Sequence, residues 1–152
     1  MKPVTVKIIW LDPESAGDLP LPTYHSDQAS GMDVAAAVAE PVQLAPGEIK
    51  MIPTNFAVAI PPGFEIQVRP RSGLAIKHGV TVINSPGTID ADYRGEIKII
   101  LVNLSNEKVE ISHGERVAQM VIAKHETISW EPVEQLDSSS RYAGGFGSTG
   151  KL

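Results

Sequence analysis

Residues 56–68, FAVAIPPGFEIQV, contain two runs in which apolar side chains recur at every second position. The first run extends from Phe56 to Ile60, and the second from Phe64 to Val68 after the intervening Pro61-Pro62-Gly63. An apolar period of two predicts β-strands, because successive side chains of a strand point to opposite faces. Proline and glycine between the runs favour a turn. This stretch therefore predicts two short strands separated by a turn.

The rest of the chain follows the same pattern. Alternation recurs from Val4 to Trp10, and helical periodicity is confined to Ser72–His78, which Gly79 would end. Val and Ile number 29 against 9 Leu, a bias that suits a pleated surface. More fully buried strands are expected at Val80–Ile83, Ile97–Leu104 and Val117–Ile122. Many short strands joined by turns predict an all-β sandwich or barrel.

Five glycines recur sixteen residues apart, and the word Gly-Glu-Ile-Lys occurs twice, at residues 47–50 and 95–98. The interval is shorter than the usual period of about 20–50 residues in repeat proteins. Two interpretations of this spacing remain open: a regular succession of turns and strands, or a coincidence. The glycines are Gly31, Gly47, Gly63, Gly79 and Gly95.

Composition bounds the class of protein. The 152 residues are 42% hydrophobic and 20% charged and contain no Cys, which predicts one globular domain without disulfide or thiol chemistry. The net charge of −5 argues against avid duplex-DNA binding, although a small anion could bind the more basic middle segment. The longest aliphatic run, Val34–Ala39, is too short to span a membrane, and the first residues lack the apolar core of a signal peptide. A cytoplasmic protein is expected.

Three stretches carry chemistry-bearing side chains, and each has an alternative interpretation. Pro70–Gly73 combines a guanidinium, a hydroxyl and a flexible backbone, which suits phosphate but also an ordinary turn. Gly87–Gly95 brings two carboxylates and an aromatic ring between strands, as a charged hairpin tip also would. In Gly114–Gln119, Arg116 could simply pair with a carboxylate. The four His show no metal-ligand spacing and are expected to be surface or packing residues.

Together with one stretch near the N-terminus and one near the C-terminus, and in this order, these three stretches resemble the five motifs of the homotrimeric all-β dUTP pyrophosphatases (dUTPases). The resemblance spans nearly the whole chain. It implies a distorted β-barrel or jelly-roll-like domain over residues 1–136, with many short strands, at most one short helix and assembly as a trimer. Residues 137–152 would form a flexible glycine-rich arm that closes over a neighbouring subunit's site. The five stretches are Ser30–Val34, Pro70–Leu74, Asn84–Gly95, Gly114–Met120 and Arg141–Gly150.

The resemblance implies hydrolysis of dUTP to dUMP and pyrophosphate, which limits uracil in DNA and supplies dUMP for thymidylate synthesis. Asp90 would be the general base for a water that attacks the α-phosphorus. Mg²⁺ would sit on triphosphate oxygens and waters, with no direct protein ligand. Two roles are open for Asp33, assisting that ion through its waters or pairing with an arginine of the second or fourth motif. The triphosphate would be held by Arg71, Ser72, Gly73 and Gln119.

The same resemblance assigns the nucleoside and the arm. Tyr93 would lie under the deoxyribose and exclude a 2′-hydroxyl. The chain departs from the family at Tyr142, where a glycine usually follows the arginine of the fifth motif. Uracil would be read by Asn84 and by groups near Gly87, Thr88, Ile89 and Lys98. The arm would contribute Arg141, Phe146, Gly147 and Ser148, with the Phe146 ring stacked on the base.

Two alternatives stand beside this function. A related dCTP deaminase shares the fold, but it needs a Glu five residues after Gly95, where this chain has Ile100. A non-catalytic trimer that binds nucleotide is the second. The expected partners are dUTP and two further copies of the chain, with neither a membrane nor a stably bound nucleic acid.

Overall fold

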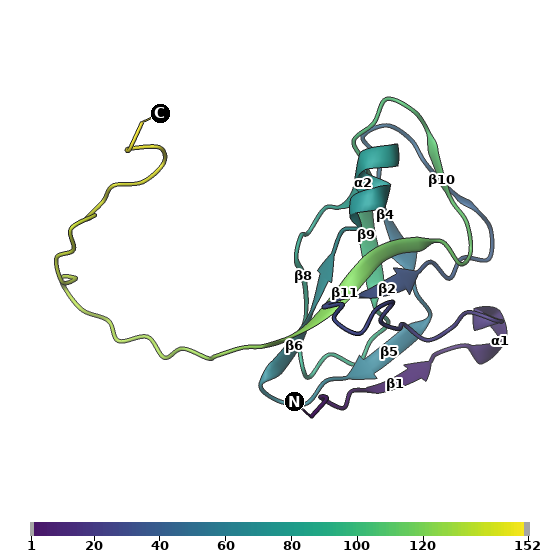
Figure 1. Cartoon of the computed structure of the whole chain (residues 1–152), viewed down its shortest axis with the longest axis horizontal. Coiled ribbons are helices and arrows are strands. Elements are labelled where there is room, and N and C mark those ends of the chain that lie inside the picture. Colours follow the sequence, from purple (N-terminus) through teal and green to yellow (C-terminus); the bar gives the residue numbers. More distant parts are fainter. Residues whose placement is uncertain (1, 151–152) are drawn as a thin grey trace.

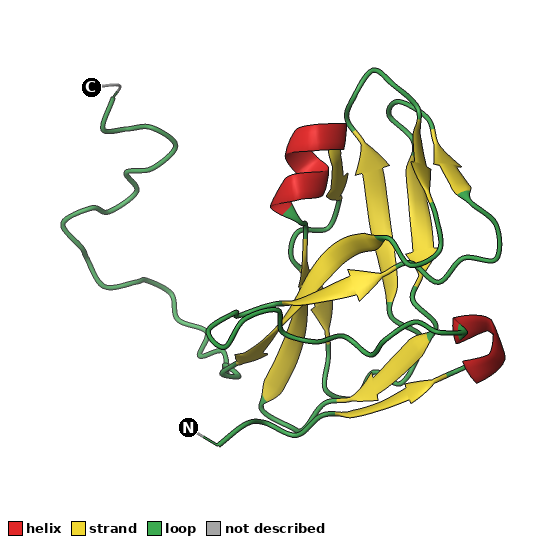
Figure 2. Ribbon diagram, turned by 45° about the vertical axis from the view of Figure 1, so that its right-hand side comes forward, coloured by secondary structure: helices red, strands yellow, loops and turns green. Residues whose placement is uncertain are grey.

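The computed structural model describes residues 2–150 and has the expected all-β architecture (Figure 1). Short strands enclose a single core, and two short helices lie at its periphery (Figure 2). The strands are β1 (Lys7–Trp10), β2 (Met32–Ala35), β3 (Val42–Leu44), β4 (Ile49–Pro53), β5 (Phe56–Ala59), β6 (Phe64–Arg69), β7 (Val80–Val82), β8 (Gly87–Ile89), β9 (Lys98–Asn103), β10 (Val109–Ile111) and β11 (Arg116–Lys124). The helices are α1 (Pro13–Ala16) and α2 (Ser72–His78).

The strands form two larger sheets and two strand pairs. One sheet has the order β2-β11-β6-β8 and the other the order β4-β9-β7, while β1 pairs with β5 and β10 with β3. Every pairing is antiparallel. Strands so short need one another's inner faces to bury enough apolar surface, which explains why they wrap around a common core.

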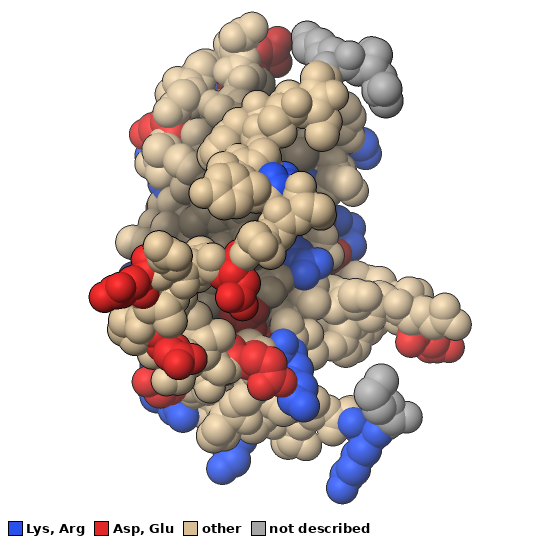
Figure 3. Space-filling model, turned by 90° about the vertical axis from the view of Figure 1, so that its left-hand side faces the viewer, with Lys and Arg blue, Asp and Glu red and all other residues tan. Residues whose placement is uncertain are grey.

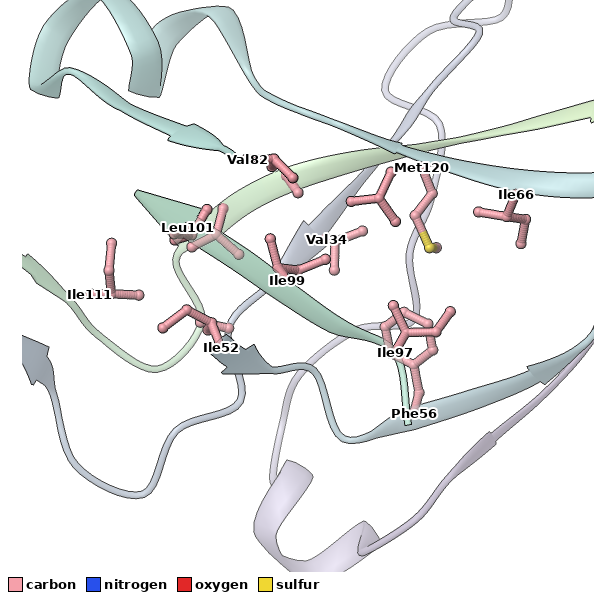
Figure 4. Close-up of a cluster of buried hydrophobic side chains, with 14 of the residues drawn as sticks. Val34, Ile52, Phe56, Ile66, Val82, Ile97, Ile99, Leu101, Ile111 and Met120 are labelled. Carbon is pink, nitrogen blue, oxygen red and sulfur yellow. The ribbon is translucent and has the colours of Figure 1, made fainter. Parts of the chain in front are cut away.

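The core is built from inward-facing residues of both larger sheets and of the two strand pairs, which contribute Phe56 and Ile111 among others (Figure 4). On β9, Ile99 and Leu101 are completely buried, and Val34 from β2 and Ile52 from β4 are equally inaccessible. Burying each such side chain stabilises the fold by about 1.5–3 kcal/mol.

On β6 the predicted alternation does mark the core face, since Ile66 and Val68 are buried. The expectation of more fully buried strands at Val80–Ile83 and Ile97–Leu104 was wrong in part, because only one face of this sheet meets the core and Ile83 and Leu104 are exposed.

Helix α2 confirms the predicted bounds. Gly79 ends it in the left-handed conformation (φ 65°), and the Gly79 N–H donates to the Ala75 carbonyl at 3.0 Å. The expectation of at most one helix was wrong, because α1 forms a further single turn. Asp12 caps α1 by accepting from the Ser15 N–H at 3.2 Å, and hydrogen bonds from Ser15 lower the pKa of Asp12. Four residues are too few to show helical periodicity in a sequence.

The five regularly spaced glycines lie in turns or connections that lead into strands. Gly31, Gly63 and Gly79 each directly precede a strand, and Gly47 and Gly95 stand two and three residues before one. Gly47, Gly63 and Gly79 have positive φ, a conformation that glycine adopts without steric cost. The regular interval therefore reflects strands and connections of similar length.

The surface seen in Figure 3 carries acidic and basic side chains interspersed, without one continuous basic band on that face. This distribution agrees with the net charge of −5. Within residues 2–150, no helix is both long and apolar enough to cross a membrane.

Asn103 is the most deeply buried polar side chain among the described residues, with 0% of its surface exposed. Its Nδ2 donates to the carbonyls of Leu44 (2.9 Å) and Glu107 (2.7 Å), and its Oδ1 accepts from the Ser105 N–H (2.9 Å). These bonds tie the end of β9 to β3 and to the connection that leads to β10.

We expect Asn103→Ala to lower the free energy of unfolding by about 2–4 kcal/mol, because two carbonyls lose their donor in a dry environment. Urea denaturation at a fixed protein concentration measures the change. Asn106→Ala, at an exposed position three residues away, is the matched control and should stay within about 0.5 kcal/mol of the parent protein. Equal effects of the two substitutions would contradict the role given to Asn103.

Candidate active site

The four-stranded sheet brings four of the five sequence motifs side by side. Its order β2-β11-β6-β8 places the first motif next to the fourth, the fourth next to the strand that leads into the second, and that strand next to the third. Gln119 on β11 lies opposite Asp33 on one side and Arg69 on the other. Residues more than 80 positions apart in the chain therefore become neighbours through backbone pairing.

Asp33 is the centre of a charged cluster. Arg71 Nε donates to Asp33 Oδ1 at 3.0 Å, and Arg116 Nη1 donates to Asp33 Oδ2 at 3.1 Å. His25 Nε2 lies 3.3 Å from the same Oδ2. The Asp33 side chain is only 18% exposed, so these contacts are partly shielded from water. Of the two roles left open by the sequence, pairing with an arginine is therefore observed for both the second and the fourth motif.

Gln119 connects three of the motifs. Its Nε2 donates to the Pro70 carbonyl at 3.0 Å, directly before Arg71. Its Oε1 lies so close to Gly31 that a Cβ on that glycine would come within 2.4 Å of it. The missing side chain at Gly31 thus makes room for the amide of Gln119.

Ser72 and Gly73 form the first turn of α2, with Arg71 as the N-cap residue. Ser72 is exposed, and no side-chain hydrogen bond caps this helix. A Cβ at Gly73 would meet no atom within 4 Å, so open space lies beside this backbone. An anion could approach the first N–H groups of α2 and the flanking guanidinium here.

A separate cleft of about 400 Å³ lies at the end of β8. It contains five of the predicted site residues, and Asp90 is exposed in it directly after β8. Apolar residues of β4 and β9 form another part of its wall. The lining residues are Met51, Thr88, Ile89, Asp90, Tyr93, Glu96, Lys98 and Ile100.

Tyr93 is held in this cleft by the residues that follow it. Its hydroxyl donates to the Glu96 carbonyl at 2.9 Å. A Cβ on Gly95 would lie 2.5 Å from that hydroxyl oxygen, so only glycine permits the ring to fold back. The Tyr93 N–H also donates to the Asp90 carbonyl at 3.2 Å, which closes a turn between the carboxylate and the ring.

Asn84 and Gly87 lie at the opposite end of β8. A Cβ on Gly87 would come within 3.0 Å of Asn84 Nδ2 and 3.3 Å of Val68 Cβ. Glycine therefore lets the amide of Asn84 pack against the start of β8 while Asn84 itself stays exposed.

The register of β6 and β8 separates the two groups of site residues within one chain. Gly87 pairs with Val68, close to Arg71, whereas Ile89 pairs with Ile66 at the far end of the ladder. Asp90 therefore leaves the sheet away from the Asp33 cluster. The cleft lining includes no residue of the second motif.

The described part of the C-terminal segment extends away from the sheets (Figure 1). It is a series of turns held by its own contacts. Arg141 Nε donates to the Gly144 carbonyl at 2.6 Å, and the Ser148 N–H donates to the Gly145 carbonyl at 2.9 Å. Phe146 is fully exposed. Tyr142 has φ 47°, the left-handed region that favours glycine.

Among residues 2–150, no group of three or more His, Asp or Glu side chains is arranged so that it could bind a metal ion. The oxygens of Asp33 already accept from two guanidinium groups. This donor set fits an ion that takes its oxygen ligands from a phosphate chain and water, as Mg²⁺ does.

Three residues that line the cleft did not emerge from the sequence as site residues. Met51 and Ile100 resemble ordinary strand residues there, and only the pairing of β4 with β9 brings them beside Asp90. Glu96 belongs to the repeated Gly-Glu-Ile-Lys word, and this repeat was the one sequence signal that could have drawn attention to it.

Comparison with known proteins places these features in one family. The dUTPase family model matches residues 18–150. The chain is 54% identical over 145 residues to a deoxyuridine 5′-triphosphate nucleotidohydrolase of Desulfotalea psychrophila, covering 95% of this chain and 97% of that protein. It is 58% identical over 130 residues to the Rickettsia felis protein of the same name, covering 86% and 88% of the two chains.

Solved structures agree. The dUTPase of Staphylococcus bacteriophage 80alpha, carrying a point substitution and in complex with dUpNHpp, superposes with a TM-score of 0.83 at 29% identity, covering 97% of this chain and 99% of that one. A dUTPase mutant from phage phi11 of S. aureus, described with a structural Mg(II) ion, has a TM-score of 0.76 at 25% identity, covering 88% and 99%.

The charged cluster predicts strong coupling between Asp33 and Arg71. Asp33→Ala and Arg71→Ala should each lower the free energy of unfolding by about 1.5–3 kcal/mol, because the first leaves two arginines without their carboxylate and the second leaves the partly buried Asp33 with Arg116 as its one arginine partner. The double variant should lose at least about 1 kcal/mol less than the sum of the two, since the same contact is removed twice. Urea denaturation of the four proteins measures this cycle, and additive losses would show that the contact contributes nothing.

Proposed function

The chain belongs to the dUTPase family and is a deoxyuridine triphosphate nucleotidohydrolase, and we propose that Asp90 is the general base of its reaction. The observation that carries this assignment is the cleft at the end of β8, where the exposed carboxylate of Asp90 shares a wall with Tyr93. A carboxylate in this position can orient a water molecule and accept its proton as the water attacks the α-phosphorus of dUTP. The products are dUMP and pyrophosphate.

The Asp33 cluster is proposed to hold the triphosphate. Asp33 orients the guanidinium groups of Arg71 and Arg116, and the open N–H groups at Ser72 and Gly73 donate hydrogen bonds to phosphate oxygens. Gln119 supports this arrangement through the Pro70 carbonyl. When bound to the triphosphate, Mg²⁺ supplies neutralisation of the phosphate charge.

The nucleoside is proposed to bind along β8 and the turn that follows it. The Asn84 amide offers both an acceptor and donors to the uracil edge, and backbone groups from Gly87 to Ile89 and at Lys98 complete the recognition. Cytosine presents the reversed pattern and would leave polar groups unpaired. Tyr93, folded onto Gly95, lies under the deoxyribose and leaves no room for a 2′-hydroxyl.

The outer face of the β4-β9-β7 sheet supports assembly as a homotrimer. Met51 lies opposite Ile100, and the Ile83 N–H donates to the Ile100 carbonyl, so these three apolar side chains share one outward row. Ile49 lies opposite Val102 in the next row. Ile49 is 53% exposed and Met51 58%, an arrangement that needs a partner surface. We assign this face to contacts between subunits.

This assignment explains why the site residues of one chain lie apart. Met51 and Ile100 belong both to the apolar face and to the cleft that contains Asp90, so the cleft opens where a neighbouring subunit would pack. The neighbour would bring its Asp33 cluster, and a further chain would bring its arm, residues 137–152, attached to the domain of residues 1–136. Arg141, Gly147 and Ser148 would contact phosphate and Phe146 the base, while water is excluded. A cytoplasmic location stays a prediction.

The two alternative functions lose their support. Ile100, where a dCTP deaminase would need a Glu, lines the cleft and presents no carboxylate. A nucleotide-binding trimer without activity does not account for an exposed carboxylate beside Tyr93 in a chain of this family.

We expect Asp90→Asn to fold and to bind dUpNHpp, but to lose at least about 10²–10⁴-fold in kcat, because the amide cannot accept the proton. Pyrophosphate release from dUTP, dCTP, dTTP and UTP, with magnesium and after chelation, measures activity and selectivity together. Asp92→Asn, two residues away and outside the cleft lining, is the control. Full turnover by a folded Asp90→Asn protein would remove Asp90 from the mechanism.

The proposed subunit contact predicts that Met51→Glu reduces the mass of the particle from three chains to one. A charge placed in an apolar interface costs more than the contact returns. Sedimentation equilibrium measures the mass, and Leu11→Glu, at a similarly exposed apolar position before α1, is the control. A trimer that survives Met51→Glu would place the interface elsewhere.

A further inference from the structure

In both Gly-Glu-Ile-Lys words the glutamate carboxylate accepts a hydrogen bond from a backbone N–H. In residues 47–50, the Glu48 carboxylate accepts from the Ala45 N–H at 2.8 Å, and this hydrogen bond holds the pKa of Glu48 below its ordinary value. In residues 95–98, the Glu96 carboxylate accepts from the Asn55 N–H at 2.9 Å. The bond of Glu48 is local and closes the turn from Ala45 to Glu48, whereas the bond of Glu96 joins segments 41 residues apart.

Each glutamate also faces the lysine two residues later. Glu48 Oε1 lies 3.2 Å from Lys50 Nζ, and Glu96 Oε2 lies 3.8 Å from Lys98 Nζ. Because β4 and β9 are antiparallel, the two words lie at opposite ends of the same strand pair. Both words therefore contain a Glu–Lys pair, but only in the second does the glutamate also hold a segment distant in the chain.

Only the second word touches the cleft. Glu96 and Lys98 line it together with Asp90 and Tyr93, and the Glu96 carbonyl accepts the Tyr93 hydroxyl. Glu48 is not among the lining residues. Glu48 therefore serves as a control position outside the cleft.

The group that holds Glu96 is itself firmly anchored. Asn55 is 8% exposed, and its Nδ2 donates to the Asp12 carbonyl at 2.7 Å while its Oδ1 accepts from the Asp12 N–H at 2.8 Å. Its φ of 64° turns the Asn55 N–H toward the Glu96 carboxylate. A carboxylate bonded to such a fixed donor loses little conformational freedom when substrate binds.

We propose that Glu96 is a positioning residue of the active site, acting through its hydrogen bond from the Asn55 N–H. This bond holds the segment between Tyr93 and Lys98, so that the acceptor for the Tyr93 hydroxyl and the backbone of Lys98 stay where the nucleoside binds. The hydrogen bond outweighs the ion pair, because an exposed pair at 3.8 Å contributes little. The inference rests on the proposed function, since it assumes that this cleft receives the nucleoside.

The test compares Glu96→Ala, Glu96→Gln and Glu48→Ala with the parent enzyme. Glu96→Ala should raise KM for dUTP by about tenfold and change kcat less than about twofold, because the nucleoside surface shifts while Asp90 keeps its own turn. Glu96→Gln should restore KM to within about threefold of the parent value, since its amide oxygen still accepts from the Asn55 N–H. Glu48→Ala should leave KM unchanged while the urea midpoint falls as it does for Glu96→Ala.

Two results would overturn the proposal. If Glu96→Gln is as impaired as Glu96→Ala, the charge and not the hydrogen bond matters. If Glu48→Ala raises KM equally, the effect is general loosening of the β4-β9 pair. Failure of the proposed function looks different, since the parent enzyme would then release no pyrophosphate. In that case, calorimetry with dUpNHpp tests the proposal. We expect Glu96→Ala to bind dUpNHpp about tenfold more weakly than the parent protein. Equal binding by the two proteins would contradict the proposal.

Discussion

Strand β11 determines the organisation of the site, because it hydrogen-bonds to β2 along one edge and to β6 along the other. Gln119 sits where both ladders meet, opposite Asp33 and Arg69. A shift of one residue in either ladder would turn Asp33 or Gln119 toward the opposite face of the sheet. The ion pairs from Asp33 to Arg71 and Arg116 therefore depend on backbone register before they depend on charge.

The same sheet explains why one chain carries a divided site. The β6-β8 ladder places Asn84 and Gly87 near the charged cluster and sends Asp90 to the other end. Asp90 then shares its cleft with Met51 and Ile100, whose outward row is apolar and exposed. In the proposed trimer, a site completed by a neighbouring copy would couple catalysis to assembly, because the surface that buries the apolar row would also close the cleft. Glu96 lies on this boundary, since it contacts both the anchored Asn55 and the cleft.

Local sequence was informative wherever a feature depends on neighbours in the chain. Helix α2 begins and ends at the predicted residues, since Gly79 can adopt the left-handed conformation that stops it. The strands β5 and β6 lie within the predicted runs or extend them by one residue. Helix α1 was missed because its stability comes from one capping carboxylate and from the contacts between Asp12 and Asn55, 43 residues apart.

The sequence by itself determined the all-β class, the alternating strands β5 and β6 and the motifs that identify the family, because these follow from side-chain periodicity and local turn chemistry. Tertiary structure alone decided which motifs become neighbours, that Asp33 pairs with two arginines, and that Met51, Ile100 and Glu96 line the cleft. The physical reason is that strand order and register join residues such as Asp33 and Arg116, 83 positions apart, and no local pattern encodes which strands will pair.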